Sequence, residues 1–298
     1  MLPGEYCGVM TVVSTIAGVL LIVVALNDVF HTLLRPASTG RLTTYMFRAA
    51  WSVSHRRPAL LTVGGPLTIL VTIGVWIVLV TVGWALIYLP HFPDGFLYSD
   101  LDPNDYHPFV EALTYSLVAL TTLGLGDVVP AEPLIRFLSP LEALTGFALL
   151  SGSVSWFMQL YPALARRRAL AVELTSLHRS GITALPPELP PGRAASVIAS
   201  VGRAIAELTA DLVQNTEIFY FAERDERLSA ARAVGYAMEL RDRALQSGNG
   251  EVRLEGAFLE QVLDELARVV TDQYAHVTGE STDEVLRAVA GSHGHQLS

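Results

Sequence analysis

Three long apolar stretches occupy the first half of the chain, from about Gly8 to Leu34, Pro66 to Leu89 and Leu134 to Tyr161. Each is long enough to cross a bilayer, which takes about 20 residues. A further apolar stretch, 109–120, lies between the second and the third but is too short to span. Pro108 precedes it and suits the first turn of a helix, where a missing amide hydrogen costs nothing. The pattern predicts three transmembrane helices and one re-entrant helix.

Beyond residue 162 the apolar residues recur at spacings of three and four, which is typical of amphipathic helices. We expect the third span to continue as a helix to about Ser180 and to stop before the proline-rich stretch 186–192. Three further helices and a short last one are predicted, and the final stretch, 291–295, is expected to be disordered. The stripes are Val197, Val201, Ile205, Leu208 and Leu212; Leu228, Ala231, Val234, Met238 and Leu245; and Leu254, Phe258, Val262, Leu266, Val269 and Val277; Ser281 and Glu284 are the expected capping box of the last helix.

Arginines mark one side of the membrane. Three of them, 166–168, follow the third span directly. The connection between the first two spans has no acidic residue and carries Arg35, Arg41, Arg48, Arg56 and Arg57. The connection before the re-entrant helix has no arginine and carries Asp94, Asp100, Asp102 and Asp105. We expect the chain to lie in the cell inner (cytoplasmic) membrane. By the positive-inside rule, its carboxy-terminal half is cytoplasmic and its amino terminus lies on the outer side.

Composition agrees with a membrane half followed by a soluble half. The chain is 51% hydrophobic and 16% charged, whereas soluble proteins average about 25% charged residues. The net charge of -9 and the lack of a basic stripe argue against nucleic-acid binding. All 20 basic residues are arginine, as is common in GC-rich prokaryotic genomes. The histidines lack partners at useful spacing, so we do not expect an enzyme.

The most informative motif, Thr121-Thr122-Leu123-Gly124-Leu125-Gly126-Asp127, follows the re-entrant stretch. Glycine tolerates backbone angles that side chains disfavour, so a short strand with alternate glycines can point successive carbonyls along one line. Four such strands around an axis form rings of oxygens that replace the water around a potassium ion. A simple glycine-rich turn is the alternative, but the position between two spans favours a selectivity filter.

Span, re-entrant helix, TTLGLGD motif and second span together resemble the pore module of tetrameric potassium channels. The resemblance covers about residues 66–161, and the filter is similar to some filters of two-pore-domain channels. The family consensus, T-T-V-G-Y-G-D, is matched at Thr121, Thr122, Gly124, Gly126 and Asp127. The expected fold class is an all-α membrane protein with three transmembrane helices, a re-entrant pore helix with its selectivity filter, and an α-helical cytoplasmic domain.

We expect four regions along the chain. They are a first span (1–34), a cytoplasmic interfacial connection (35–65), the pore module (66–161) and a helical cytoplasmic domain (162–298). Within the connection, the aromatic and basic stretch 42–51 is expected to lie on the inner leaflet as an interfacial helix.

The resemblance also implies which residues hold the ion. The K+ filter would consist of Thr122, Leu123, Gly124, Leu125 and Gly126, with main-chain carbonyls and the Thr122 hydroxyl as ligands. Thr121 and Asp127 would flank it, with Asp127 at the outer mouth. Both leucine side chains should point away from the pore.

Leu125 departs from the family pattern, because the tyrosine usually found there braces the filter through its hydroxyl. Leucine cannot form a hydrogen bond. We therefore expect a filter held mainly by apolar packing and able to gate by itself.

Two polar or flexible features in the spans are candidates for function. Gly146 occupies the place of a gating hinge in the third span, although close helix packing explains a small residue equally well. Asp28 and His31 are three residues apart and share a helix face near the cytoplasmic end of the first span. They could form an intramembrane polar pair, or they lie near the interface and pair with Arg35 or a neighbouring helix.

The sequence thus predicts a homotetrameric channel that conducts K+ passively, with itself and the lipid bilayer as partners and room for an unidentified cytoplasmic regulator. The first alternative is a potassium-uptake transporter subunit, although such proteins usually carry four loops in one chain. The second is a non-conducting membrane sensor with a pore-like fold.

Overall fold

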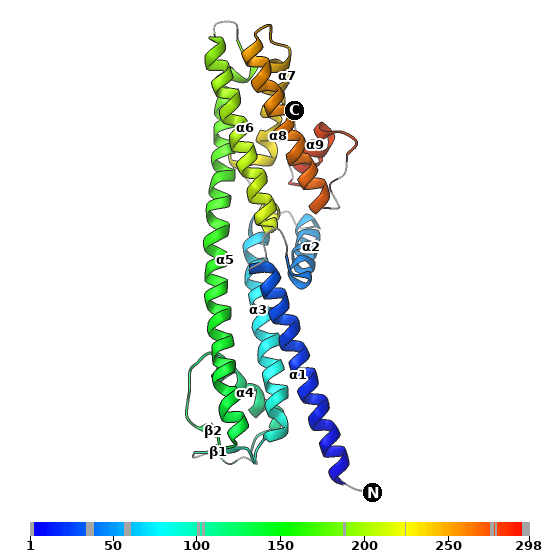
Figure 1. Cartoon of the computed structure of the whole chain (residues 1–298), viewed down its shortest axis with the longest axis vertical. Coiled ribbons are helices and arrows are strands. Elements are labelled where there is room, and N and C mark those ends of the chain that lie inside the picture. Colours follow the sequence, from blue (N-terminus) through cyan, green and yellow to red (C-terminus); the bar gives the residue numbers. More distant parts are fainter. Residues whose placement is uncertain are drawn as a thin grey trace. The chain divides into compact units, whose positions relative to one another are not determined.

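The computed structural model describes residues 3–33, 39–56, 61–99, 102, 105–186, 189–223, 225–274, 277 and 279–293. Arg35, Arg57 and Asp100 lie outside the described residues. The chain divides into two compact units (Figure 1): residues 1–35, 39–46 and 68–157 form the first unit, and residues 36–38, 47–67 and 158–298 form the second.

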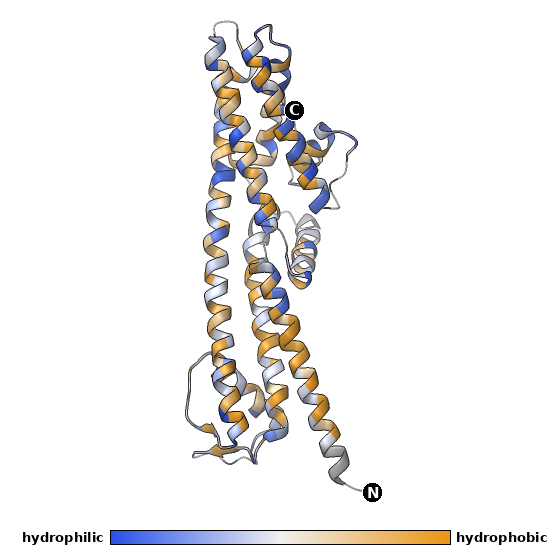
Figure 2. Ribbon diagram, viewed as in Figure 1, coloured by the Kyte–Doolittle hydropathy of each residue, from blue (hydrophilic) through white to orange (hydrophobic). Residues whose placement is uncertain are grey.

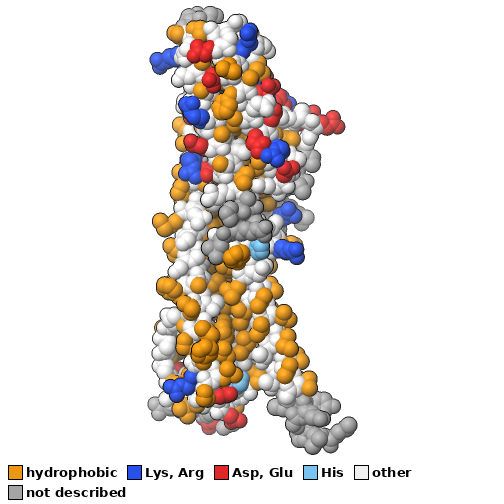
Figure 3. All heavy atoms as spheres, viewed as in Figure 1, with side chains coloured by type: hydrophobic (Ala, Val, Ile, Leu, Met, Phe, Trp, Pro, Cys, Tyr) orange, Lys and Arg blue, Asp and Glu red, His pale blue; other side chains and the backbone are white. Residues whose placement is uncertain are grey.

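Among the described residues, three helices are long and apolar enough to cross a membrane: α1 (Pro3–Leu33), α3 (Leu61–Tyr88) and α5 (Pro133–Arg179). Their hydrophobic residues run along almost the whole of α1 and α3 (Figure 2). Orange side chains also gather on the visible surface of these two helices (Figure 3). The predicted fold class, an all-α membrane protein, is confirmed.

The re-entrant stretch is a separate short helix, α4 (Pro108–Leu120). His107 caps its amino terminus by accepting a hydrogen bond from the amide of Phe109, and Pro108 takes the first helical position as predicted. Its 13 residues reach about 20 Å, which is too short to cross a bilayer.

A two-stranded antiparallel sheet flanks the pore segment, and the sequence reading did not foresee it. Strand β1 (Phe96–Tyr98) pairs with β2 (Val128–Pro130), and Phe96 faces Pro130 in the register. The amide of Ser99 extends the ladder by donating to the Asp127 carbonyl (2.8 Å). The sheet therefore ties the end of the candidate filter to the loop that follows α3.

The second unit is a bundle of amphipathic helices with a core of small, aliphatic and aromatic side chains. Its long elements are α6 (Pro191–Gln214), α7 (Ala230–Leu245), α8 (Gly250–Gln273) and α9 (Thr282–Ser292). Helix α2 (Arg41–Arg56) contributes its second half. Short 3-10 turns in this unit occupy Ile182–Ala184, Thr216–Tyr220 and Glu226–Leu228, and a further one in the first unit occupies Leu89–His91.

Several details of the predicted stripes are wrong. Leu228 lies in a 3-10 turn before α7, and Val277 lies beyond the end of α8. Leu254 and Phe258 are exposed, because α8 turns the face of Val252, Gly256 and Leu259 inward. The Gly256 Cα approaches Ala244 of α7 so closely that an added Cβ would lie 2.7 Å from the alanine Cβ, so this close contact between α7 and α8 requires a glycine.

The last helix is capped as predicted, but the end of the chain differs. Ser281 accepts a hydrogen bond from the Glu284 amide, while the Glu284 carboxylate bonds to the amide of Glu280 rather than that of Ser281. His293, which was expected in a disordered tail, is buried and its Nε2 lies 2.8 Å from the Phe219 carbonyl. Residues 294–298 lie outside the described residues.

Candidate functional site: a candidate ion pore

The end of α4 folds into a two-bond helix cap that leads directly into the TTLGLGD stretch. The amide of Thr122 donates to the Ala119 carbonyl (3.0 Å), and the amide of Leu123 donates to the Val118 carbonyl (3.0 Å). This pair of bonds is a Schellman motif, whose residue after the cap takes a left-handed backbone. That residue is usually glycine, but here it is Thr122, with a φ of 57°.

Backbone φ alternates in sign through the motif. It is positive at Thr122, Gly124 (58°) and Gly126 (82°), and it is not positive at the leucines between them. Alternation of left- and right-handed residues turns successive peptide planes the same way, so the amides collect on one side and the carbonyls on the other. A positive φ at a β-branched residue is strained, and such strain concentrates at functional sites. The local backbone thus has the form that a row of ion-facing carbonyls requires.

Side chains of this segment have little contact within the chain. Leu123 is 65% exposed and Leu125 is 59% exposed. Thr121 turns back to the helix, since its hydroxyl donates to the Leu117 carbonyl (2.7 Å). The Asp127 carboxylate accepts a hydrogen bond from the amide of Val128 (3.0 Å), at the start of β2.

One face of α5 positions the pore helix. Ser139, Glu142 and Gly146 recur at spacings of three and four, so they share that face. The Tyr115 hydroxyl donates to Ser139 (2.8 Å), and Ser116 lies 2.5 Å from the Glu142 carboxyl.

Gly146 completes this face by touching the last carbonyl of α4. A Cβ at Gly146 would lie 1.9 Å from the Leu120 oxygen. The geometry therefore favours the packing explanation for this glycine, while its role as a hinge stays a prediction. Gly152 is also a packing position, because a Cβ there would lie 2.7 Å from Leu33 of α1.

An aromatic cluster packs around Tyr115 of the pore helix. Tyr115 meets Tyr88 edge-on with ring centroids 5.2 Å apart, and Phe96 with centroids 4.8 Å apart. Trp84 stacks on Tyr88, and Phe92 stacks on Phe96. The helix that aims the filter is thus held by polar bonds as well as by apolar packing.

A cavity of about 310 Å³ borders the base of the filter segment. Thr121 and Thr122 line it together with apolar residues of α3 and α5, including Trp76, Phe147 and Leu150. The filter base therefore faces open space on this side of the chain.

Comparison with known proteins identifies this part of the chain. A family model described as Ion channel matches residues 67–161, which comprise α4, the filter segment and the apolar parts of α3 and α5. This segment belongs to the pore-loop ion-channel family. The predicted resemblance to a channel pore is thereby confirmed.

Two curated relatives are similar to the chain. Two pore potassium channel c of Oryza sativa subsp. japonica is 41% identical over 58 residues, which are 18% of this chain and 13% of that protein. Uncharacterized membrane protein YdjJ of Bacillus subtilis (strain 168) is 27% identical over 175 residues, which are 56% of this chain and 49% of that protein. The chain thus matches about half the length of one relative and about an eighth of the other. No solved structure matches it.

Asp28 is a buried structural acid. Its carboxylate accepts hydrogen bonds from the Leu42 amide (2.8 Å), the Thr43 amide and hydroxyl (3.2 and 2.7 Å) and the Trp76 indole (2.9 Å). The amides belong to the first turn of α2, where unpaired donors and the helix dipole favour a negative charge. His31 instead lies edge-on to Phe30. The carboxylate therefore joins α1, α2 and α3, which agrees with the alternative of a pairing with a neighbouring helix, although the sequence could not name partners that are 14 to 48 residues away.

The three arginines that follow the third span also have structural partners. Arg166 pairs with Asp211, and Arg168 pairs with Glu223. Arg167 is buried and donates to the carbonyls of Ile218 and Phe221, each at 2.5 Å. These bonds fix the end of α5 to the helical bundle of the second unit.

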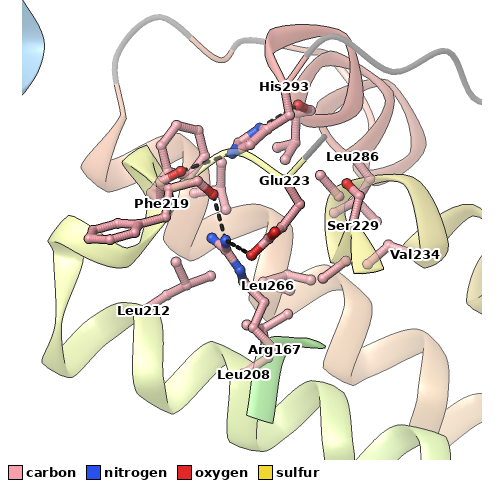
Figure 4. A pocket seen from close by; sticks show the side chains of 15 residues that line it. Arg167, Leu208, Leu212, Phe219, Glu223, Ser229, Val234, Leu266, Leu286 and His293 are labelled. Carbon is pink, nitrogen blue, oxygen red and sulfur yellow. Dashed lines mark hydrogen bonds and ion pairs between the residues drawn. The ribbon is translucent and has the colours of Figure 1, made fainter. Parts of the chain in front are cut away.

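A small pocket of about 60 Å³ surrounds Arg167 (Figure 4). Leu212, Val234 and Leu266 contribute to its mostly apolar lining. Its polar members already have partners, since Arg167 is bonded to main-chain carbonyls and His293 to Phe219. The pocket is therefore part of the bundle core, and its lining does not indicate a ligand for the second unit.

Proposed function

We propose that this chain forms a homotetrameric, potassium-selective channel. In the proposed channel, four filter segments face one axis, and the carbonyls of Thr122, Leu123, Gly124 and Leu125 bind dehydrated K+, with Gly126 and Asp127 at the outer mouth. The observation that carries the proposal is the alternating φ of residues 122–126 at the end of a re-entrant helix. Side-chain substitutions at the leucine positions leave such main-chain ligands in place.

Exposure of the filter segment supports assembly from several copies. Leu123 and Leu125 are large apolar side chains that are exposed in one chain. Exposed apolar side chains also run down α5 and include Phe147, Leu150, Val154 and Met158. A single chain supplies one filter segment, whereas a ring of carbonyls needs several. The name of the rice relative, Two pore potassium channel c, agrees with K+ as the permeant ion.

In the proposed topology, the filter opens outward and the amino terminus lies on the same side. The second unit would be cytoplasmic, because the arginines at 166–168 and on α2 favour the inside. The location would be the cytoplasmic membrane.

Single-channel recording of the purified protein in planar bilayers tests the proposal. It compares a variant of a filter glycine with a control variant of a second glycine that has similar backbone strain. Gly124 and Gly181 both have positive φ, 58° and 75°, and neither has an atom near its would-be Cβ. Each change to alanine therefore costs about 1–2 kcal/mol of backbone strain. We expect Gly124→Ala to abolish or strongly reduce K+ conductance, and Gly181→Ala to conduct as the wild type does. A folded wild-type tetramer that never conducts would instead favour the membrane-sensor alternative.

A further inference from the structure

Glu142 is a carboxyl group buried in the middle of the channel module. Its side chain is fully buried in α5, and so is Ser116 of the pore helix, whose hydroxyl oxygen lies 2.5 Å from Glu142 Oε1. The same hydroxyl oxygen lies 2.9 Å from the main-chain carbonyl of Thr81 in α3. Three helices thus meet at one serine.

The count of hydrogens at this junction assigns the proton. A serine hydroxyl has one hydrogen to donate, and a main-chain carbonyl can only accept. If Ser116 donates to Thr81, the 2.5 Å contact with Glu142 becomes a hydrogen bond only when Glu142 donates to the serine oxygen. A Glu142 carboxylate could accept the serine hydrogen instead. The Ser116 oxygen and the Thr81 carbonyl oxygen would then face each other at 2.9 Å with no hydrogen between them.

The surroundings of Glu142 favour the same assignment. The groups that face it are neutral, namely Ser116 from α4 and Tyr88 from α3. Its second oxygen, Oε2, has no hydrogen-bond partner among the described residues, although the Tyr88 hydroxyl lies beside the carboxyl group. Leaving a carbonyl oxygen unpaired costs far less than burying an unpaired charge.

We propose that Glu142 is a neutral carboxylic acid that donates a hydrogen bond to the Ser116 oxygen and so positions the pore helix behind the filter. Ser116 in turn donates a hydrogen bond to the Thr81 carbonyl, and these two bonds join α5, α4 and α3. This brace lies five residues before the TTLGLGD motif, and it compensates for Leu125, which cannot form the hydrogen bond of the family's tyrosine. The inference rests on the proposed function for its effect on selectivity, but not for the position of the proton.

Infrared spectroscopy of the full-length protein in lipid tests the proton directly. We expect the carbonyl band of a protonated carboxylic acid in the wild type, lost in Glu142→Gln and kept in the control Glu132→Gln, which changes a partly exposed glutamate beside His91. An unchanged band in Glu142→Gln would overturn the proposal. This readout does not depend on conduction, so it stands even if the protein carries no K+ current.

Bi-ionic recordings test the positioning role. Glutamine keeps a donor for Ser116, so Glu142→Gln should retain the wild-type K+/Na+ permeability ratio. Glu142→Leu has a similar volume without a donor and should lower the ratio about fivefold or more, which corresponds to ~1 kcal/mol for one lost buried bond. Ser116→Ala removes the acceptor and should lower the ratio in the same way. It serves as the test variant if Glu142→Leu does not fold. Wild-type selectivity in Glu142→Leu or Ser116→Ala would contradict the role.

Discussion

The contact between α5 and the end of the pore helix can be tested with a single methyl group. In Gly146→Ala the new Cβ would lie 1.9 Å from the Leu120 oxygen and 2.9 Å from its carbonyl carbon. Carbon–oxygen contacts between helices normally measure about 3.3–3.6 Å, so the two helices must separate by roughly 1.4 Å. Both contact atoms that force this shift are backbone, which cannot turn away as a side chain can.

The expected cost follows from two opposing terms. Overpacking of this kind typically costs about 1–3 kcal/mol, while alanine gains up to about 1 kcal/mol over glycine in a helix interior. We therefore expect a net loss of up to about 2 kcal/mol, together with displacement of the filter that follows Leu120.

Gly74→Ala is the matched control. Gly74 lies within α3, and its Cβ would meet no atom within 4 Å, so alanine should be neutral or slightly stabilising there. The assay is the apparent melting temperature of each purified variant in the same detergent, followed by conductance in bilayers. Equal stability of the two variants with wild-type conductance would refute the packing argument. Normal stability of Gly146→Ala with altered opening and closing would show that the glycine is a hinge instead.

Three further changes have defined outcomes. Asp28→Asn should destabilise the protein by about 3 kcal/mol in thermal unfolding, because one amide oxygen cannot replace a carboxylate that accepts from Leu42, Thr43 and Trp76; an unchanged melting temperature would mean that these bonds contribute nothing. Thr122→Gly should relieve about 1 kcal/mol of left-handed strain yet lower K+/Na+ selectivity, since it removes a hydroxyl ligand, and selectivity equal to the wild type would exclude that ligand. Burial raises the pKa of Glu217 from 4.5 to about 7. The free energy of unfolding is therefore unaffected by this group below pH 4.5 and declines as the pH rises to about 7. The total loss above that pH is about 3 kcal/mol. Glu217→Gln should remove this decline in unfolding experiments between pH 4.5 and 8, and a variant with the same pH profile as the wild type would contradict it.

Elements that depend on local pattern were predictable from the sequence. Hydropathy and length gave the three spans, and Pro108 with a short apolar run gave the pore helix. The continuation of the third span to about Ser180 agrees with α5 ending at Arg179. These features are fixed by neighbours a few residues away, so a single sequence contains them.

Features that depend on distant partners were not predictable. The β1–β2 pair joins short strands about 30 residues apart, and neither strand is long enough to leave an alternating pattern. Asp28 reads as a candidate for function until its partners on α2 and α3 are known. A signal for the α5 face did exist, because Ser139, Glu142 and Gly146 are polar or small residues at helical spacing in an apolar span, but the pattern does not name the residues that they meet.

The reversal potential under bi-ionic conditions tests the central claim most directly. Purified protein in a planar bilayer, with K+ on one side and an equal concentration of Na+ on the other, should give a current that reverses far from zero, at a potential negative on the K+ side, because a row of main-chain carbonyls from Thr122 to Leu125 selects K+. A conducting protein whose current reverses near zero would contradict a potassium filter at this segment.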